Sequence, residues 1–300
     1  ISYKSDKIMI IVKLMGGLGN QMFQYALGKH LAIKHNTKLK LDLTFLLDRT
    51  PRPDFTFRDY ELGIFNITAS FASEKEVSDF LNVSKYTHWK DRLKQKIYRY
   101  HHFIEQQFDF DEKVLNLPRN TYLEGYWQCE KYFIDPEEEI RKAFTFKDQP
   151  CAYYAALGEQ ARKCNSVSVH FRRCDYVNNP LINSYHGECT IEYYERAMAK
   201  IRSQIPSAVF FMLSDDITWV KKQFAGADHV VFVENANHAG HEDMRLMSIC
   251  KHNIIANSSY SWWGAWLNKN PGKIVIAPEK WFKDSTRSFK DIIPEAWIKL

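Results

Sequence analysis

The 300-residue chain is 45% hydrophobic and 26% charged, the composition of an ordinary soluble globular protein, which excludes fibrous and low-complexity classes. Its formal net charge of +5, from 41 basic and 36 acidic residues, is dispersed and too small for a nucleic-acid-binding surface. It suits a site for an anionic small molecule, and we predict no nucleic-acid partner. Six cysteines without a C-x-x-C or zinc-ligand spacing predict reduced thiols in a cytosolic protein.

The apolar run at 8–14 is interrupted by Lys13 and is too short for a membrane span. We therefore predict no transmembrane segment and a cytoplasmic location, with peripheral attachment at the inner membrane face as the alternative. Oligomeric state is left open.

The first elements in chain order are a buried strand at 8–14, a glycine-rich loop, a helix at 21–35 and a strand at 39–43. This order is typical of loops that cradle phosphate, in which Gly17, Gly19 and Asn20 lie before a helix N-terminus. The dinucleotide fingerprint fails, because Met22 stands where a small residue is needed. A plain tight turn is the alternative.

Residues 44–150 are less regular, with a polar helix predicted at 89–105, a short strand at 122–127 and a helix at 136–143. Asp109 and Asp111 form a D-x-D pattern, which can hold a divalent metal. No strand precedes this pattern, so a helix start or a surface segment is the favoured interpretation.

From 150 onward, short apolar runs alternate with helical segments, which predicts a parallel, doubly wound sheet. The predicted strands are 167–171, 208–213, 229–233, 253–256 and 273–277, and the helices are 190–204, 216–225, 241–251 and 259–269. The predicted fold class is α/β, with two Rossmann-like lobes at 1–150 and 151–300 that face a cleft. Packing of the last segment, 281–300, back onto the first lobe is an open alternative.

Ionisable and hydroxyl side chains follow these strands, and the carboxyl ends of parallel strands meet at one edge of the sheet. Arg172 and Arg173 offer fork-shaped donors that suit phosphate. Asp215 or Asp216 can accept hydrogen bonds from guanine. The site candidates among them are His170, Arg172, Arg173, Asp175, Asp215, Asp216, Asn257, Ser258 and Ser259. Arginine–aspartate salt bridges and helix capping are the structural alternatives. Trp262, Trp263 and Trp266 are assigned to core packing.

Four motifs, at 16–26, 170–176, 214–216 and 257–267, resemble those of bacterial α-1,2-fucosyltransferases of glycosyltransferase family 11, and 123–128 resembles the family's mid-chain signature. The resemblance implies a GT-B fold with an acceptor-side N-terminal lobe and a donor-binding C-terminal lobe. It also implies inverting transfer of fucose from GDP-β-L-fucose to the 2-hydroxyl of a terminal galactose on an oligosaccharide. Neither a metal ion nor another cofactor is expected.

By position, Arg172 looks like the arginine that binds the donor phosphate, with Arg173 in support. The other donor-binding residues that the resemblance implies are His170, Asp215 or Asp216, Asn257, Ser258 and Ser259, with Gly17, Gly19 and Asn20 lining the cleft from the first lobe. Asp175 is the candidate catalytic base. It could instead orient the arginines, in which case no strong base is required.

Two other classes of function are considered. An NAD-linked sugar-nucleotide epimerase or dehydrogenase would share the α/β architecture, but the incomplete G-x-G-x-x-G speaks against it. A non-catalytic protein that binds a nucleotide or a carbohydrate would have little use for a diphosphate site, and it would bind GDP without turnover.

Overall fold

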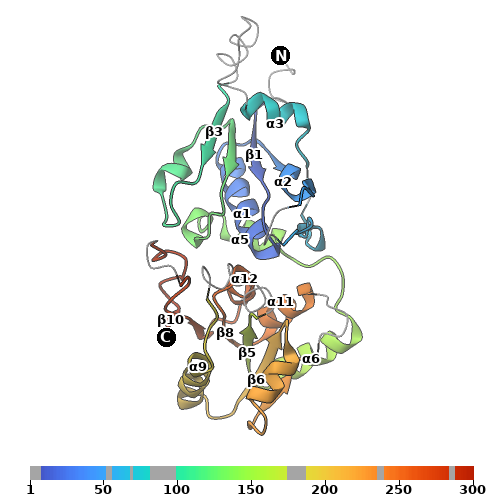
Figure 1. Cartoon of the computed structure of the whole chain (residues 1–300), viewed down its shortest axis with the longest axis vertical. Coiled ribbons are helices and arrows are strands. Elements are labelled where there is room, and N and C mark those ends of the chain that lie inside the picture. The colour runs from blue at the N-terminus through green and yellow to red at the C-terminus, as the bar shows by residue number, and fades with distance from the viewer. Residues whose placement is uncertain are drawn as a thin grey trace, which may run out of the picture. The chain divides into compact units, whose positions relative to one another are not determined.

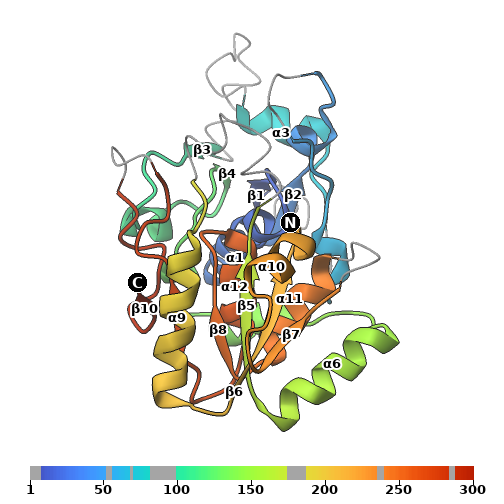
Figure 2. The same ribbon diagram turned by 60° about the horizontal axis from the view of Figure 1, so that its bottom comes forward.

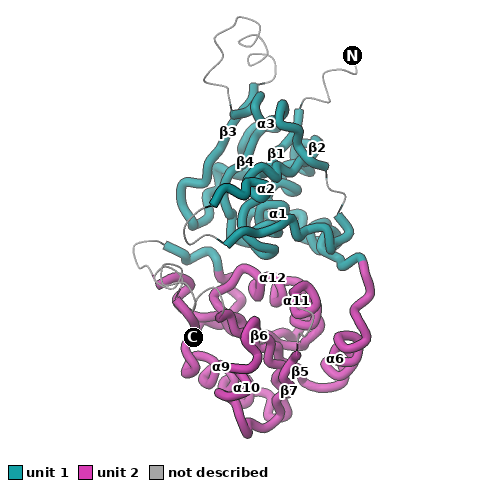
Figure 3. Tube along the Cα trace, turned by 45° about the vertical axis from the view of Figure 1, so that its right-hand side comes forward, with its two compact units in different colours: residues 1–147, 288–292 teal, residues 148–287, 293–300 magenta. Residues whose placement is uncertain are grey.

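The computed structural model describes residues 8–51, 56–67, 70–81, 99–173, 187–234, 240–283 and 288–300. The chain divides into two compact units, coloured separately in Figure 3. Unit 1 comprises residues 1–147 with 288–292, and unit 2 comprises 148–287 with 293–300. Within the described ranges, no helix is long and apolar enough to cross a membrane.

Unit 1 is built on a four-stranded parallel sheet in the order β2-β1-β4-β3 (Figure 1). Its strands are β1 (Met9–Lys13), β2 (Lys38–Asp42), β3 (His101–Ile104) and β4 (Thr121–Glu124). The remaining elements of the unit are α1 (Leu18–Lys34), α2 (Thr44–Leu47), η2 (Leu62–Ile64), α3 (Glu74–Leu81), η4 (Glu112–Asn116), η5 (Glu130–Tyr132) and α5 (Glu137–Ala143).

Alternate residues of β1 face opposite layers, as the two-residue period of a strand requires. Val12 packs against Gly28 of α1, where an added Cβ would lie 2.4 Å from Val12 Cγ2. Met9 and Ile11 belong instead to the cluster beneath Phe80 of α3. Both faces of the strand are therefore covered, which explains its continuous apolar sequence.

Unit 2 contains a six-stranded parallel sheet in the order β10-β9-β8-β5-β6-β7 (Figure 2). The strands are β5 (Asn165–Phe171), β6 (Ala208–Ser214), β7 (Val230–Phe232), β8 (His252–Ile254), β9 (Val275–Ala277) and β10 (Ile298–Lys299). The helices are α6 (Ala152–Lys163), α9 (Ile191–Gln204), α10 (Ile217–Gln223), α11 (Gly240–Ile249) and α12 (Ser259–Leu267).

Helices cover both faces of this sheet as well. On β6, Phe210 and Met212 pack with α9 and α10, while Phe211 and Leu213 pack with α6 and α11. The predicted α/β fold with parallel sheets and Rossmann-like lobes is confirmed. Trp262, Trp263 and Trp266 are buried in the core, as predicted.

The helix predicted at 89–105 is wrong over its last residues. His101–Ile104 forms β3, which pairs with β4 along its whole length, and 82–98 lies outside the described residues. The local polar pattern is overridden because pairing with β4 satisfies the backbone of this segment. The other predicted helices and strands are present, with ends that differ by up to three residues.

Candidate functional site

The polar residues of unit 2 gather where the strand order reverses. From β5 the chain proceeds through β6 and β7 on one side, and later through β8, β9 and β10 on the other. The crevice at such a switch point, outside the carboxyl ends of the strands, is the usual ligand position in open α/β sheets. Here it lies between the end of β5, with His170 and Arg172, and the end of β8, followed by Asn257 and Ser258.

His170 is a buried, neutral imidazole near the end of β5. Its side chain lies 5.4 Å, centroid to centroid, from the Tyr260 ring. Burial, with the positive charge of Arg172 adding to it, lowers the pKa of His170 to about 3. Its Nδ1 is buried and has no hydrogen-bond partner within the described structure. A buried polar atom left in this way is suited to a ligand hydrogen bond.

Arg172 and Asp215 connect the ends of two neighbouring strands. Arg172 Nη1 lies 3.1 Å from Asp215 Oδ2, and each side chain is 24% exposed. The other carboxylate oxygen of Asp215 accepts a hydrogen bond from the Arg173 N–H at 2.9 Å. Asp215 therefore orients the arginine segment, while Arg172 stays accessible to a ligand.

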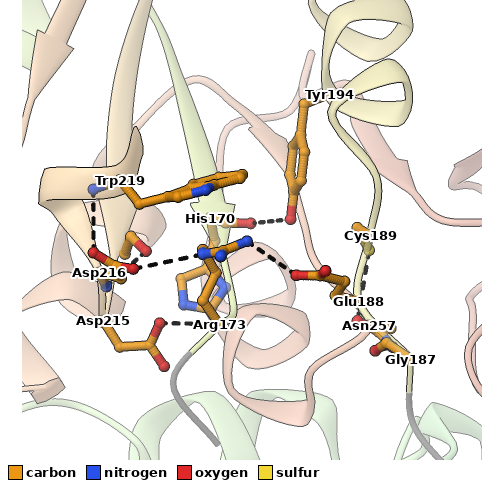
Figure 4. A network of polar contacts seen from close by, with 11 residues as sticks. His170, Arg173, Gly187, Glu188, Cys189, Tyr194, Asp215, Asp216, Trp219 and Asn257 are labelled. Atoms are coloured by element: carbon orange, nitrogen blue, oxygen red, sulfur yellow. Dashed lines mark hydrogen bonds and ion pairs between the residues drawn. The ribbon is translucent and has the colours of Figure 1, made fainter. Parts of the chain in front are cut away.

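Arg173 is enclosed more tightly (Figure 4). Its guanidinium lies over the Trp219 ring, 3.5 Å from the ring centroid, and donates to Glu188 Oε2 at 2.9 Å. Asp216 Oδ2 is 3.6 Å from its Nε, close enough for an ion pair. With 14% of its side chain exposed, Arg173 is a positioning residue in this geometry. It joins the segment after β5 to the loop before α9 and to α10.

Asp216 has a second structural task. Its carboxylate accepts from the Trp219 N–H at 3.1 Å, and its own N–H donates to Ser214 Oγ at 2.9 Å. Asp216 is thus the N-cap of α10, which confirms the capping alternative for this residue. Whether Asp215 or Asp216 contacts a nucleotide stays a prediction.

Asn257 and Ser258 differ in what they leave for a ligand. The Asn257 amide donates to Gly187 O and to Trp281 O, each at 3.1 Å, so both of its donors hold the backbone of neighbouring loops. Ser258 stands at the N-cap of α12, yet its hydroxyl makes no capping bond to that helix. Ser258, Ser259 and the α12 N-terminus therefore form the side of the crevice that favours an anion.

A cavity of about 570 Å³ opens beside this crevice, within the size range of small-molecule sites. Glu188 and Asn257 line it together with the cationic side chains of Arg196, Lys280 and Lys283. The two arginines after β5 do not line it. Glu188 both lines this cavity and bonds to Arg173, so it links the cavity to the arginine segment.

Asp175, the candidate base, lies outside the described residues, so its role stays a prediction. The D-x-D segment has a structural role, because Asp111 accepts a hydrogen bond from the Lys113 N–H at 3.0 Å and caps η4. This confirms the helix-start interpretation. No group of three or more metal-ligating side chains occurs among the residues that the structure describes.

The glycine loop of unit 1 connects β1 to α1, with Gly17 at the N-cap. The Leu18 N–H donates to Glu61 Oε2 at 2.9 Å, so a carboxylate of the chain itself already occupies part of the helix N-terminus. Asn20 Oδ1 accepts from Gln128 Nε2 at 2.7 Å. Contacts of Gly17, Gly19 and Asn20 with a donor stay predictions, and Glu61 weakens the case for phosphate at this loop.

Three residues of the unit 2 site were missed by sequence reasoning. Glu188 and Trp219 hold Arg173, although they lie 15 and 46 positions away in sequence, and no local pattern connects them. Asp243 is a buried carboxylate of α11 that accepts from Tyr154 OH at 2.5 Å. Burial raises the pKa of Tyr260, and the negative charge of Asp243 raises it further. An acidic pair at the start of the predicted helix at 241–251 was the available signal for Asp243.

The site thus combines accessible and anchored cationic groups, a neutral imidazole and a helix N-terminus at one sheet edge. Such a set can bind a diphosphate and stabilise negative charge that develops on it. The chain matches the model of glycosyl transferase family 11 over residues 2–300, and it belongs to that family of glycosyltransferases.

Two curated proteins and one solved structure are similar to this chain. The chain is 37% identical to an alpha-1,2-colitosyltransferase of Escherichia coli, over 97% of this chain and 99% of that protein. It is 27% identical to a galactoside 2-alpha-L-fucosyltransferase of Caenorhabditis elegans, over 58% of this chain and 51% of that protein. A crystal structure of NodZ alpha-1,6-fucosyltransferase with GDP is 16% identical, with a TM-score of 0.49 over 86% of this chain and 91% of that one.

Proposed function

We propose that this glycosyltransferase transfers L-fucose from GDP-β-L-fucose to the 2-hydroxyl of a terminal β-galactoside, with inversion and without a metal ion. The observation that carries the proposal is the position of Arg172, partly exposed at the switch point of the unit 2 sheet and oriented by Asp215. The relationship to a galactoside 2-alpha-L-fucosyltransferase supports the sugar and the linkage.

In the proposed reaction the acceptor oxygen forms a bond to C1 of fucose while the bond from C1 to the diphosphate oxygen breaks. The bonding electron pair leaves with GDP, where negative charge develops. Arg172 and the N-terminus of α12 stabilise that charge, which lowers the barrier to departure. The proton of the acceptor hydroxyl passes to Asp175 or to water. Arg173, held by Glu188 and Trp219, keeps the segment that carries Arg172 in place.

The test is incubation with GDP-fucose and lactose, followed by linkage analysis of the product. We expect 2′-fucosyllactose and an equal amount of GDP. Binding of GDP without any transfer to a panel of β-galactosides would favour the non-catalytic binding protein instead. Fucose attached at another position of the acceptor would contradict the proposed linkage.

A second donor deserves a direct comparison, because a chain-length relative at 37% identity is a colitosyltransferase. Colitose lacks the 3-hydroxyl that fucose carries. A site that hydrogen-bonds this hydroxyl discriminates strongly against the deoxy sugar, whereas an apolar site does not. The ratio of kcat/KM for the two nucleotide-activated sugars, measured with one acceptor, decides between the donors.

A further inference from the structure

A second cluster of polar side chains lies at the carboxyl edge of the unit 1 sheet. Lys13 is the last residue of β1, Glu124 is the last of β4, and His102 belongs to β3, the edge strand that pairs with β4. Lys13 Nζ is 2.7 Å from Glu124 Oε1, and His102 Nε2 is 3.2 Å from Glu124 Oε2. A single carboxylate therefore brings together three neighbouring strands.

The cluster is accessible, which separates it from the other carboxylate at the same edge. Asp42, at the end of β2, is 1% exposed and accepts hydrogen bonds from Tyr122 OH and from the Thr44 N–H and hydroxyl. Its oxygens are committed to the fold. By contrast, the Glu124 and Lys13 side chains are 27% and 21% exposed, so a ligand can reach them.

Glu124 is suited to accepting hydrogen bonds and poorly suited to taking a proton. Burial raises its pKa, but the hydrogen bonds and charges of Lys13 and His102 outweigh burial, and the net pKa is lowered. The group is anionic at neutral pH, whereas an efficient general base has a pKa near the working pH. Binding is therefore the role that its chemistry favours.

The cluster matches a neutral, hydroxyl-rich ligand. The positive charge of Lys13 offsets the negative charge of Glu124, and the set offers an ammonium, a carboxylate and an imidazole to hydroxyl groups. Lys13 Nζ also lies 5.7 Å from the ring centroid of Phe45, a half-buried aromatic of α2. An apolar ring beside a few polar groups is the usual composition of a small-molecule site.

We infer that the Lys13–His102–Glu124 cluster binds hydroxyl groups of the acceptor glycan. The inference rests on the proposed function, because a transferase needs a site for each of its two substrates. Unit 2 supplies arginines and a helix N-terminus for an anionic donor. In the unit 1 cluster the opposite charges of Lys13 and Glu124 offset each other, which suits an uncharged sugar acceptor.

The experiment compares Glu124→Gln and His102→Gln with a matched control, Glu76→Gln. Glu76 also pairs with a lysine of the unit 1 sheet, with 2.6 Å between Lys40 Nζ and Glu76 Oε1. Its side chain is 26% exposed, close to the 27% of Glu124. Four quantities are measured for each variant: the KM for lactose, the KM for GDP-fucose, hydrolysis of GDP-fucose without acceptor, and Tm.

We expect Glu124→Gln to raise the KM for lactose by roughly 10- to 100-fold, since it removes a charged hydrogen-bond acceptor. The KM for GDP-fucose and its hydrolysis should stay within about twofold of wild type, and His102→Gln should give a smaller shift of the same kind. Glu76→Gln should leave all substrate constants unchanged. Equal changes in the KM for lactose in the Glu124 and Glu76 variants would overturn the inference. A parallel loss of GDP-fucose hydrolysis and of transfer in Glu124→Gln would overturn it as well.

Binding of lactose, followed by saturation-transfer NMR on the full chain, gives a readout that does not depend on turnover. Wild type and Glu76→Gln should show transfer to the galactose protons, and Glu124→Gln should not. If wild type binds lactose through Glu124 yet releases no GDP from GDP-fucose, the proposed donor is wrong and the acceptor site stands. If wild type transfers fucose while Glu124→Gln binds lactose normally, only the inference fails.

Discussion

Arg172 and Arg173 are adjacent in sequence, but their surroundings separate their tasks. The Arg172 side chain is 24% exposed and pairs with Asp215 at the crevice. The Arg173 side chain is 14% exposed, stacks on Trp219 and bonds to Glu188. An arginine enclosed on this many sides fixes the backbone around it, whereas its neighbour can turn its donors to a phosphate.

This difference predicts a graded loss of activity. Arg172→Ala should lower kcat by about 100-fold or more, because a charge-stabilising donor at the leaving group is lost. Glu188→Gln should cost only a few-fold, since it loosens Arg173 through a half-exposed ion pair worth about 1 kcal/mol. Steady-state kinetics at saturating acceptor checks both. Arg162→Ala, which breaks an exposed pair on α6, serves as control. Equal rates for wild type and Arg172→Ala would refute the role of Arg172.

His170 makes the stability of the fold sensitive to acid. Its pKa is about 3 in the folded chain, against an ordinary value of 6.5. Between these values the unfolded chain binds the proton and the folded chain does not. This contribution is therefore fully present above about pH 6.5 and falls by roughly 1.4 kcal/mol for each pH unit between that value and about pH 3.

Urea unfolding between pH 5 and 7.5, followed by tryptophan fluorescence, measures this effect. The free energy of unfolding should fall less steeply with decreasing pH in His170→Gln than in wild type, because glutamine does not titrate. Other titratable groups contribute equally to both proteins. Parallel curves for the two proteins would show that His170 is not the group responsible.

At the scale of elements, strands such as β1 and β6 could be read from the sequence because both of their faces are buried. The run from Ala208 to Leu213 is therefore continuously apolar. The predicted ends of helices and strands differ from the observed ones by a few residues, because capping depends on contacts with residues distant in sequence. Two strands escaped prediction. His101–Ile104 is short and rich in histidine, and Ile298–Lys299 has only two residues. Their identity comes from pairing with β4 and β9 and is absent from the local pattern.

The candidate site shows the same division. Residues at or shortly after the end of a strand, such as His170, Arg172 and Ser258, could be placed at the sheet edge because topology alone puts them there. The partners that set their roles could not be predicted. Glu188 contacts Arg173 from the loop before α9, and Trp219 contacts it from α10. Those contacts depend on the packing of three elements whose separations in sequence carry no signal.

Two glycines in helices of unit 2 give opposite predictions. A Cβ on Gly264 of α12 would lie 2.8 Å from Met247 Cβ, whereas one on Gly158 of α6 would meet nothing closer than 3.5 Å. Gly264→Ala should therefore lower stability by about 1–2 kcal/mol, because overpacking exceeds the gain in helix propensity. Gly158→Ala should raise stability by up to about 1 kcal/mol. Thermal unfolding of both variants tests the pair, and stabilisation by Gly264→Ala would show that α11 and α12 are loosely packed.

At the scale of the whole molecule, the net charge of +5 is small, so attraction of a dianionic donor must come from locally placed cations. Unit 2 places Arg172 and the α12 N-terminus at one edge of its sheet. In the proposed reaction, they supply the positive charge that a metal ion provides in other enzymes. The proposed chemistry therefore predicts a donor site that functions without a divalent cation.

The last prediction follows from that arrangement. At 100 times its dissociation constant, GDP should stabilise the protein by about 2.7 kcal/mol by mass action. The resulting rise in Tm should be the same with excess EDTA as with Mg²⁺, and so should the rate of transfer. Arg172→Ala should lose most of the rise in both conditions, whereas Arg162→Ala should keep it. A rise in Tm or a rate that collapses in EDTA and returns with Mg²⁺ or Mn²⁺ would contradict the arginine-based mechanism, because the leaving diphosphate would then depend on a bound cation for its stabilisation.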